Sequence, residues 1–313
     1  MKSESTGDRW HSLATYLMLA GAAAGWGVSA VAVKFSVEDL PPLTVACLRF
    51  GLGSLLLLAV LWRRGEIWHV PPPRAWPTLL GLGVLGVTAF GALFTAGLRW
   101  TGAAEGTLIH GTNPLVTVLL ATALLGERLG LIRLAGVVLS LAGLVMLVLG
   151  GPGPWGQGDF RLLGDVLMIG SAISWGSYSV GVRMVMGRFS LTETSAYSVF
   201  VGALLLIPFA LLEMLRMPLG EVRPMTWLAI GYQIVVSSCL AYLWWNEGVR
   251  RIGAARAAAF SYVTPVTTIV AAAVLLGERL GPLQILGGVM ALGGVVLVNR
   301  GPLRPSRSHE GAR

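Results

Sequence analysis

The chain has 313 residues, of which 55% are hydrophobic and only 12% are charged. A soluble domain usually carries about 25% charged residues, so this chain lacks the side chains that would cover a water-exposed surface. Its formal net charge is +8, but the basic residues stand singly or in pairs between long apolar runs. That arrangement is typical of membrane flanks and argues against binding of nucleic acid, which needs a clustered basic patch.

Ten apolar runs are each long enough to cross a membrane as a helix, which takes about 20 residues. The connections between the runs are short and contain Gly, Pro and Arg. We therefore expect an all-α integral membrane protein with ten transmembrane helices and no soluble domain. The predicted spans are residues 13–34, 43–62, 76–98, 102–125, 131–149, 162–186, 194–215, 225–248, 254–276 and 283–299.

The basic residues of the connections predict the orientation of the chain. If the N-terminus lies in the cytoplasm, 16 Lys and Arg residues fall on the cytoplasmic side and 6 on the other side. This bias follows the positive-inside rule and places both tails, residues 1–11 and 301–313, in the cytoplasm. The 16 are Lys2, Arg9, Arg63, Arg64, Arg74, Arg128, Arg133, Arg183, Arg188, Arg250, Arg251, Arg256, Arg300, Arg304, Arg307 and Arg313; the 6 are Lys34, Arg99, Arg161, Arg216, Arg223 and Arg279.

The sequence contains an internal repeat. Residues 124–130, Leu-Leu-Gly-Glu-Arg-Leu-Gly, recur unchanged as residues 275–281, at an offset of 151 residues. A unit of five spans, residues 12–150, is therefore duplicated in residues 151–300. Because five is odd, the second copy enters from the opposite side, and such inverted repeats are typical of transporters that alternate access around a midplane site. The same offset pairs Pro114 with Pro265, Gly136 with Gly287 and Gly143 with Gly294, and an offset of 149 pairs Trp26-Gly27 with Trp175-Gly176.

Each five-helix unit has Trp-Gly in its first helix, Asn-Pro or Thr-Pro in its fourth, and then Leu-Leu-Gly-Glu-Arg-Leu. This pattern resembles the EamA-type branch of the drug/metabolite transporter superfamily over residues 12–300. The resemblance implies a ten-helix carrier of the inner membrane, often an exporter of amino acids or other small metabolites. Its cavity would be lined mainly by the first, third, fourth, sixth, eighth and ninth helices. The expected partners are a small-molecule substrate and the lipid bilayer, and the sequence leaves the oligomeric state open, a monomer included.

Two prolines fall near the middle of the fourth and ninth spans, Pro114 and Pro265. Proline donates no backbone hydrogen bond and crowds the carbonyl four residues earlier, so we expect a helix break at each position. Polar groups at this depth usually face the interior of a bundle, which predicts a cavity next to each break. The alternative is a packing kink whose hydroxyl groups bond to their own helix. The predicted lining residues are His110 and Asn113 in the first half and Ser261 and Thr264 in the second.

Aromatic and polar side chains share one face of the sixth span at helical spacing. Aromatic rings with polar tips suit a pocket for a flat or amphipathic ligand. The alternatives are aromatic packing inside the protein and an aromatic belt at the membrane interface. The candidate substrate-binding residues are Ser171, Ser174, Trp175 and Tyr178 in the sixth span, Trp26 and Ser29 in the first, and Gln233, Ser237 and Tyr242 in the eighth.

His110 is the candidate for proton coupling, because it lies nearest the midplane and histidine titrates near neutral pH. The alternative is a neutral histidine that bonds to a neighbouring helix. Most of the other ionisable residues within or near the spans, a group that includes Lys34 and Arg49, are expected to reach the interface or to cap helices. Glu127 and Glu278 of the repeated motif are expected to fix the turns where they lie.

We expect a secondary transporter that moves a small amphipathic metabolite and exports it by alternating access. A membrane-embedded enzyme and a pore are the alternatives. The sequence has no Walker A motif, no His-Glu-x-x-His and no Gly-x-Ser-x-Gly, so we expect no ATP engine, catalytic residue, cofactor or metal site. The segment Gly81–Gly86 matches a dinucleotide fingerprint by letter, but it lies within a span, where close helix packing explains its glycines.

Overall fold

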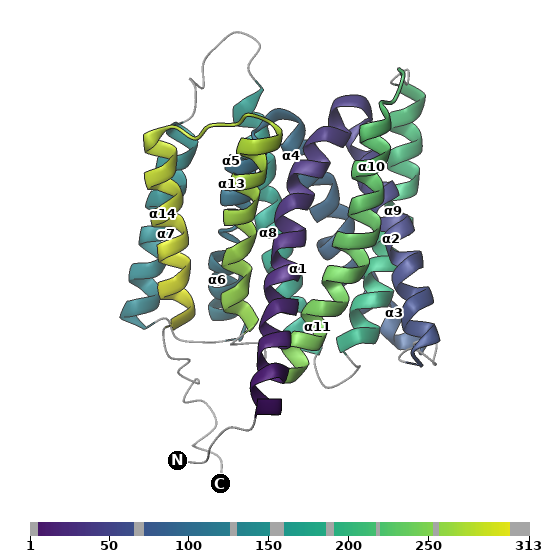
Figure 1. The fold of residues 1–313 in the computed structure, drawn as a ribbon, viewed down its shortest axis with the longest axis horizontal. Coiled ribbons are helices and arrows are strands. Elements are labelled where there is room, and N and C mark those ends of the chain that lie inside the picture. Colours follow the sequence, from purple (N-terminus) through teal and green to yellow (C-terminus); the bar gives the residue numbers. More distant parts are fainter. Residues whose placement is uncertain are drawn as a thin grey trace.

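The computed structural model describes residues 6–65, 72–125, 130–150, 160–185, 191–216, 220–252 and 257–300. Within these ranges the regular structure is helical throughout. The helices stand side by side, and the two termini of the described chain, the start of the helix at Thr6 and the end of the helix at Arg300, lie at the same end of the bundle (Figure 1). The predicted tail 301–313 and the turn at Glu127 lie outside the described residues.

The first half of the chain contains the first five predicted spans. Two of them are interrupted, the third by a π-helical segment and the fourth by a break before Pro114. The elements are α1 (Thr6–Asp39), α2 (Pro42–Arg63), η1 (Pro73–Ala75) with α3 (Trp76–Gly83), η2 (Val84–Ala89) and α4 (Phe90–Trp100), then α5 (Ala103–His110) with α6 (Asn113–Leu125), and α7 (Leu131–Leu149).

The second half repeats this order, with a π-helical segment in its third span and a 3-10 helix in place of the break in its fourth. Seven helical stretches of the described chain are long and apolar enough to cross a membrane, and two further apolar helices are shorter. The polar residues Asp165, Ser171 and Ser174 interrupt the apolar run of α8. The elements are α8 (Arg161–Val185), α9 (Leu191–Arg216), α10 (Pro224–Tyr232) with η3 (Gln233–Leu240) and α11 (Ala241–Ile252), then η4 (Ala258–Tyr262) with α13 (Val263–Leu275), and α14 (Pro282–Arg300).

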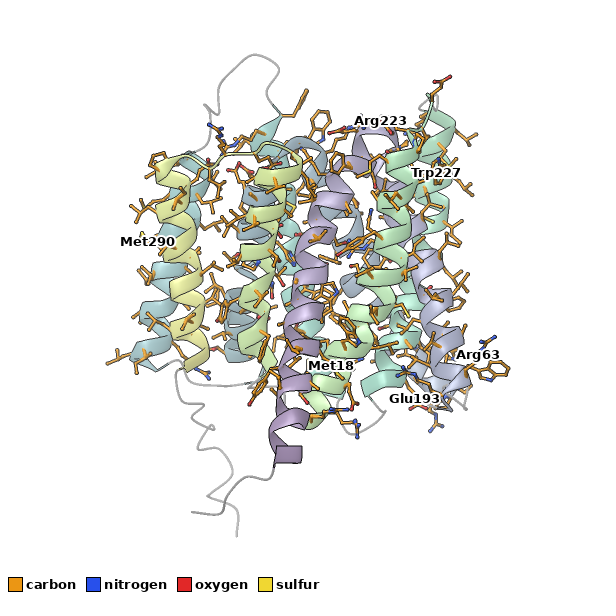
Figure 2. The ribbon with its side chains drawn as sticks, viewed as in Figure 1. Met18, Arg63, Glu193, Arg223, Trp227 and Met290 are labelled. Carbon is orange, nitrogen blue, oxygen red and sulfur yellow. The ribbon has the colours of Figure 1, made fainter. Side chains whose placement is uncertain are left out.

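The outer surface and the two ends of the bundle differ in character, as a membrane requires. Figure 2 shows Trp227 and Met290 on the outside of the bundle, and Trp227 is 54% exposed. Arg63 and Glu193 lie at the end that holds the termini, and Arg223 lies at the opposite end. Apolar side chains therefore cover the flank that lipid would contact, and charged side chains occupy both ends.

The two halves are inverted relative to each other. Helix α1 starts at the end that holds the termini, whereas α8 starts at the opposite end (Figure 1). Their last helices, α7 and α14, pack through glycines: a Cβ on Gly136 would lie 2.7 Å from the carbonyl oxygen of Gly294, and a Cβ on Gly143 would lie 2.6 Å from that of Gly287. Because Gly136 corresponds to Gly287 and Gly143 to Gly294, the two contacts are one contact repeated by a pseudo-twofold axis.

A second pair of contacts obeys the same symmetry. A Cβ on Gly27 of α1 would lie 3.0 Å from the Cβ of Thr267 in α13, and a Cβ on Gly176 of α8 would lie 2.8 Å from the Cβ of Val116 in α6. The repeat offsets relate Gly27 to Gly176 and Thr267 to Val116. The glycine of each repeated Trp-Gly pair therefore lets the first helix of one half approach the broken fourth helix of the other half.

The π-helical segments also occupy equivalent positions. Segment η2 runs from Val84 to Ala89 and η3 from Gln233 to Leu240, and their last residues are 151 positions apart. A π-helical turn leaves part of the regular hydrogen-bond ladder open, and such turns are frequent at functional sites. Both halves therefore carry the same local irregularity in the third helix, next to the break in the fourth.

Candidate substrate site

The break in the fourth span satisfies its own backbone groups. Helix α5 ends at His110, and α6 begins at Asn113, so Pro114 lies in the first turn of a new helix, where its missing N–H costs little. The side-chain amide nitrogen of Asn113, Nδ2, donates to the backbone carbonyl of His110 at 3.0 Å. The helix break expected at Pro114 is therefore present, and the side chain of Asn113 satisfies the carbonyl of His110 within the same span.

Pro265 lies in a similar place in the second half, as the third residue of α13. The hydroxyl of Thr264 donates to the carbonyl of Ala23 in α1 at 3.1 Å. Thr268, one turn later, donates to the carbonyl of Gly27 at 2.9 Å. These bonds cross from α13 to α1, so Thr264 and Thr268 join two helices of different halves. Ser261, on η4, is exposed.

His110 lies in a cluster of rings, called here the aromatic cluster. Its ring centroid is 5.3 Å from those of Phe90 and Phe94, which follow η2 on α4. Trp175 of α8 lies 5.0 Å from Phe90 and 5.2 Å from Tyr178. His110, Trp175 and Tyr178 are half-buried. Three predicted site residues from two helices are thus brought together, at centroid separations within the range of favourable aromatic pairs.

Two serines of α8 tie this cluster to its surroundings. The Nδ1 atom of His110 lies 3.0 Å from the hydroxyl oxygen of Ser171, which is the bond to a neighbouring helix that the structural alternative for His110 predicts. The hydroxyl of Ser174 donates to the carbonyl of Leu85 in η2 at 2.7 Å. Ser174 thus holds a backbone group of the π-helical segment, which fixes α8 against the third helix of the first half.

The second half has an equivalent junction at Ser237 of η3. The indole Nε1 of Trp26 donates to the carbonyl of Ser237 at 3.0 Å, and the Trp26 ring lies 5.2 Å from that of Trp245. Gln233 is fully buried, and its amide nitrogen donates to the hydroxyl of Ser36 at 3.0 Å. Trp26 and Gln233 therefore both bond across the interface between α1 and η3, Trp26 to Ser237 and Gln233 to Ser36.

Arg49 of α2 is also at this junction. The expectation that it reaches the interface is wrong, because its side chain is only 8% exposed. Its Nη2 atom donates to the hydroxyl of Ser237 at 3.2 Å, and its guanidinium carbon lies 4.8 Å from the centroid of the Phe50 ring. Phe50 lies 6.1 Å from Phe90, so Arg49 adjoins the aromatic cluster. Insertion of a charge at this depth costs about 2.5–3.5 kcal/mol.

Tyr242 lies apart from both groups. It packs beside Leu57, Leu61 and Cys239, in a small apolar cluster between α2 and α11. Ser29 is 2% exposed and lies on α1 three residues after Trp26, on the face that meets η3. The structure therefore brings together most of the predicted residues in two adjoining groups. It leaves Tyr242, Ser261 and Thr264 outside them, and Asn113 bonds within its own span.

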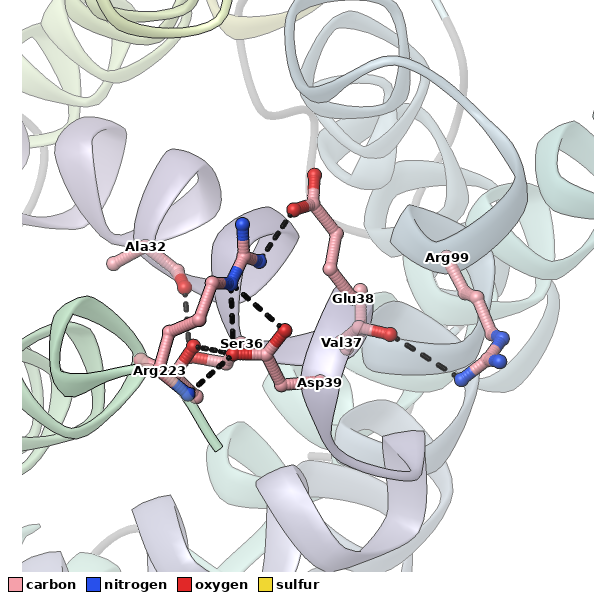
Figure 3. A network of polar contacts seen from close by, with 8 residues as sticks. Ala32, Ser36, Val37, Glu38, Asp39, Arg99 and Arg223 are labelled. Carbon is pink, nitrogen blue, oxygen red and sulfur yellow. Dashed lines mark hydrogen bonds and ion pairs between the residues drawn. The ribbon is translucent and has the colours of Figure 1, made fainter. Parts of the chain in front are cut away.

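Polar contacts close the end of the bundle opposite the termini. The guanidinium of Arg223 pairs with Glu38 at 2.6 Å and with Asp39 at 2.9 Å (Figure 3). These hydrogen bonds raise the pKa of Arg223 further above its ordinary value. Arg99 donates to the carbonyl of Val37 at 3.2 Å. A cavity of about 350 Å³ opens beside these contacts, lined by Lys34, Val37, Glu38, Arg99 and Trp100.

The remaining charged residues near the spans act on helix ends. Lys34 donates to the carbonyl of Thr101 at 2.7 Å, which confirms its expected capping role. Glu278 accepts hydrogen bonds from the backbone N–H groups of Ala103 at 2.8 Å and Ala104 at 3.0 Å. The repeated Gly-Glu-Arg-Leu turn of the second half therefore caps α5 of the first half.

A buried ion cluster lies near the start of α8. Arg161 pairs with both Glu105 and Asp165, and the hydroxyl of Thr101 donates to Asp165 at 2.6 Å. The three charged side chains are at most 7% exposed. Each charge has a partner of opposite sign, so this cluster fixes α5 against α8.

The sequence pattern of the EamA-like transporter family matches the chain twice, over residues 13–149 and over residues 162–300. The chain belongs to this family. Its membership makes it a membrane transporter with a duplicated five-helix unit, and it argues against an enzyme.

Curated relatives cover nearly the full length of the chain. A protein named "Uncharacterized transporter" from Archaeoglobus fulgidus is 32% identical over 90% of this chain and 96% of its own length. A "Probable amino-acid metabolite efflux pump" of Escherichia coli strain K12 is 27% identical, with 87% and 90% covered. A "Probable terminal-alkyne amino-acid exporter" of Streptantibioticus cattleyicolor is 26% identical, with 88% and 90% covered. One solved crystal structure shares the fold with a TM-score of 0.63 and 25% identity, covering 92% of this chain and 98% of that one.

Sequence reasoning missed three phenylalanines and the special position of Arg49. Phe90 and Phe94 are four residues apart, a spacing that puts them on one helix face, and that signal was available. For Arg49, only the neighbouring elements reveal that its side chain turns inward. The π-helical segments left no pattern in the sequence that would have identified them.

Proposed function

We propose that this protein is a secondary carrier that exports a small amphipathic metabolite, such as an amino acid, by alternating access around a site between its two halves. The observation that carries the proposal is the pair of symmetry-related junctions, Ser174 with Leu85 and Trp26 with Ser237. In each junction the first helix of one half binds the irregular third helix of the other half. Inverted repeats with broken helices at mid-depth are typical of carriers that rock one half against the other.

Three further points support this proposal. The aromatic cluster offers half-buried rings from α5 and α8 to an apolar or flat group. Ser29, Gln233 and Ser237 supply polar groups beside it. The Escherichia coli and Streptantibioticus cattleyicolor relatives have names that describe efflux or export of amino acids or their metabolites.

The test is counterflow in vesicles that contain the purified protein. A carrier should concentrate a labelled solute against an excess of the same unlabelled solute on the other side, because both cross through one alternating site. An all-or-none ionic conductance without counterflow would identify a pore instead. A screen of amino acids and related metabolites for efflux from overproducing cells supplies the solute.

We further propose that the protein lies in the inner membrane with both termini in the cytoplasm. The support is the excess of basic residues on that side. Single cysteines at Arg64, Arg74 and Arg250, in a background without Cys47 and Cys239, should resist an impermeant thiol reagent in whole cells. A cysteine at Glu221, at the opposite end, is the control that should react. The reverse pattern would overturn the orientation.

Proton coupling through His110 is a separate proposal. Its support is the position of this imidazole in the aromatic cluster, with one nitrogen on Ser171.

A further inference from the structure

Arg49 is an inward-facing cation without an acidic partner. No Asp or Glu of the described chain pairs with its guanidinium, which donates one hydrogen bond, to the neutral hydroxyl of Ser237. Its Nε atom has no hydrogen-bond partner. A buried guanidinium normally meets a carboxylate or another anion, because an uncompensated charge in a low-dielectric interior is strongly unfavourable.

Three other basic residues near the ends of the spans, Arg161, Arg223 and Lys34, differ from Arg49 in this respect. Arg161 pairs with Glu105 and Asp165, and Arg223 pairs with Glu38 and Asp39. Lys34 donates to the carbonyls of Thr101 and Arg99. A purely structural arginine would be expected to resemble these, with several acceptors. Arg49 instead leaves donor capacity unused at the junction of the two halves.

Neutral polar groups without partners lie on the elements that surround Arg49. The side-chain carbonyl oxygen of Gln233 and the hydroxyl oxygen of Ser29 are buried and make no hydrogen bond. Gln233 lies four residues before Ser237 in η3, and Ser29 lies three residues after Trp26, which itself binds Ser237. Buried polar groups are normally satisfied, so several unsatisfied groups on α1, α2 and η3 indicate a site for a ligand with complementary polar atoms.

We propose that Arg49 binds the carboxylate of the transported molecule. A guanidinium presents parallel N–H groups that match the two oxygens of a carboxylate. The contact of Arg49 with Phe50, and of Phe50 with Phe90, places the apolar part of the same molecule against the aromatic cluster. The ligand class is therefore a small carboxylate with an apolar side chain, which includes the apolar amino acids. This inference rests on the proposed function and narrows its substrate class.

The test compares acids with their neutral-headgroup analogues. Vesicles that contain the purified protein are loaded with leucine, methionine, phenylalanine and tryptophan, or with the amides of the same four amino acids, and efflux of each compound is measured. We expect the acids to leave about 10- to 100-fold faster than the amides, as befits one charge-assisted hydrogen-bonded contact. In Arg49→Gln that ratio should fall to near one, and Arg49→Lys should retain part of it.

Two features keep the outcomes distinct. If Arg49 only supports the fold, Arg49→Gln slows acids and amides by the same factor and leaves the ratio unchanged, which overturns the inference. Efflux of acids and amides at equal rates from the unaltered protein overturns it as well, while the carrier function stands. If none of the eight compounds moves but another solute shows counterflow, the carrier again stands and this substrate class is wrong. Absence of counterflow for any solute would instead remove the proposed function. Thermal melting in detergent verifies that each variant is folded.

Discussion

The two halves of this protein share a framework but differ in the side chains that they direct inward. Glycines at equivalent positions make equivalent close contacts, as Gly27 and Gly176 do. Residues of the two inward groups have diverged. By the repeat offsets, Phe90 corresponds to Ala241, Tyr178 to Ser29 and Arg49 to Ser198. One group of inward residues is thus built mainly from rings, whereas the other combines the rings of Trp26 and Trp245 with polar side chains and a buried cation.

This difference shows which positions a duplicated carrier must keep. Contacts between backbones tolerate only glycine, because any Cβ would overlap a neighbouring helix. Residues at the interface between the halves are free to change. Because these residues differ between the halves, the two ends of a bound ligand can meet different side chains. The predictions below test first the shared framework and then the divergent residues.

The largest effect is expected from alanine at the framework glycines. In Gly27→Ala the new Cβ would lie 2.6 Å from the backbone oxygen of Thr264, and in Gly176→Ala it would lie 3.1 Å from that of Asn113. We expect losses in the free energy of unfolding of about 3 kcal/mol and about 1–2 kcal/mol, the scale of overpacking. Gly81→Ala, which meets no atom within 4 Å, is the control. Unfolding by denaturing detergent measures all three, and equal stability would refute the shared framework.

The next effect concerns the aromatic cluster. Trp175→Ala removes a large ring that contacts Phe90 and Tyr178, so substrate affinity should fall by about 1–3 kcal/mol, the scale of losing one buried apolar side chain. Val145, which is 56% exposed on α7, supplies the control Val145→Ala. Equilibrium binding of the solute found in the efflux screen gives both values. An unchanged affinity in folded Trp175→Ala would place the site elsewhere.

A smaller effect is expected at the hydrogen bonds that join the halves. Ser174→Ala leaves the carbonyl of Leu85 without its donor, and Trp26→Phe does the same to the carbonyl of Ser237. Each change should lower the free energy of unfolding by about 0.5–1.5 kcal/mol. Ser177→Ala is the comparison, because this hydroxyl bonds only within its own helix, to Ile173. Losses no greater than in Ser177→Ala would show that the junctions add little.

The smallest expected change is one of pH dependence. If His110 carries the coupled proton, His110→Gln should keep substrate binding but flatten the dependence of transport on pH, because glutamine does not titrate in that range. Rates of counterflow and of proton-driven transport between about pH 5.5 and 8 distinguish the two properties. An active variant with the original pH profile would remove His110 from this role.

Helix content, the duplication and its inversion could be predicted from the sequence, because long apolar runs and an exact repeated motif are visible without coordinates. Glu278 was expected to fix its own turn, but its carboxylate caps α5 of the first half, a partner that the sequence did not identify. The buried position of the Arg49 side chain could not be predicted, because the residues next to it in the sequence also fit an arginine that reaches the membrane interface. The hydrogen bond of Asn113 to the carbonyl of His110 could not be predicted either. A carbonyl freed by a proline can face a cavity or accept a hydrogen bond from a nearby side-chain amide. Such outcomes depend on contacts between helices that are distant in sequence.

The central claim is that both halves contribute to one site, and the number of ligand molecules bound per chain tests it most directly. Equilibrium binding of the solute identified by the efflux screen should give one molecule per chain. Trp175→Ala, in the second half, and Arg49→Gln, in the first, should each weaken that single binding event. Two molecules per chain, with each variant affecting only one of them, would contradict a shared site.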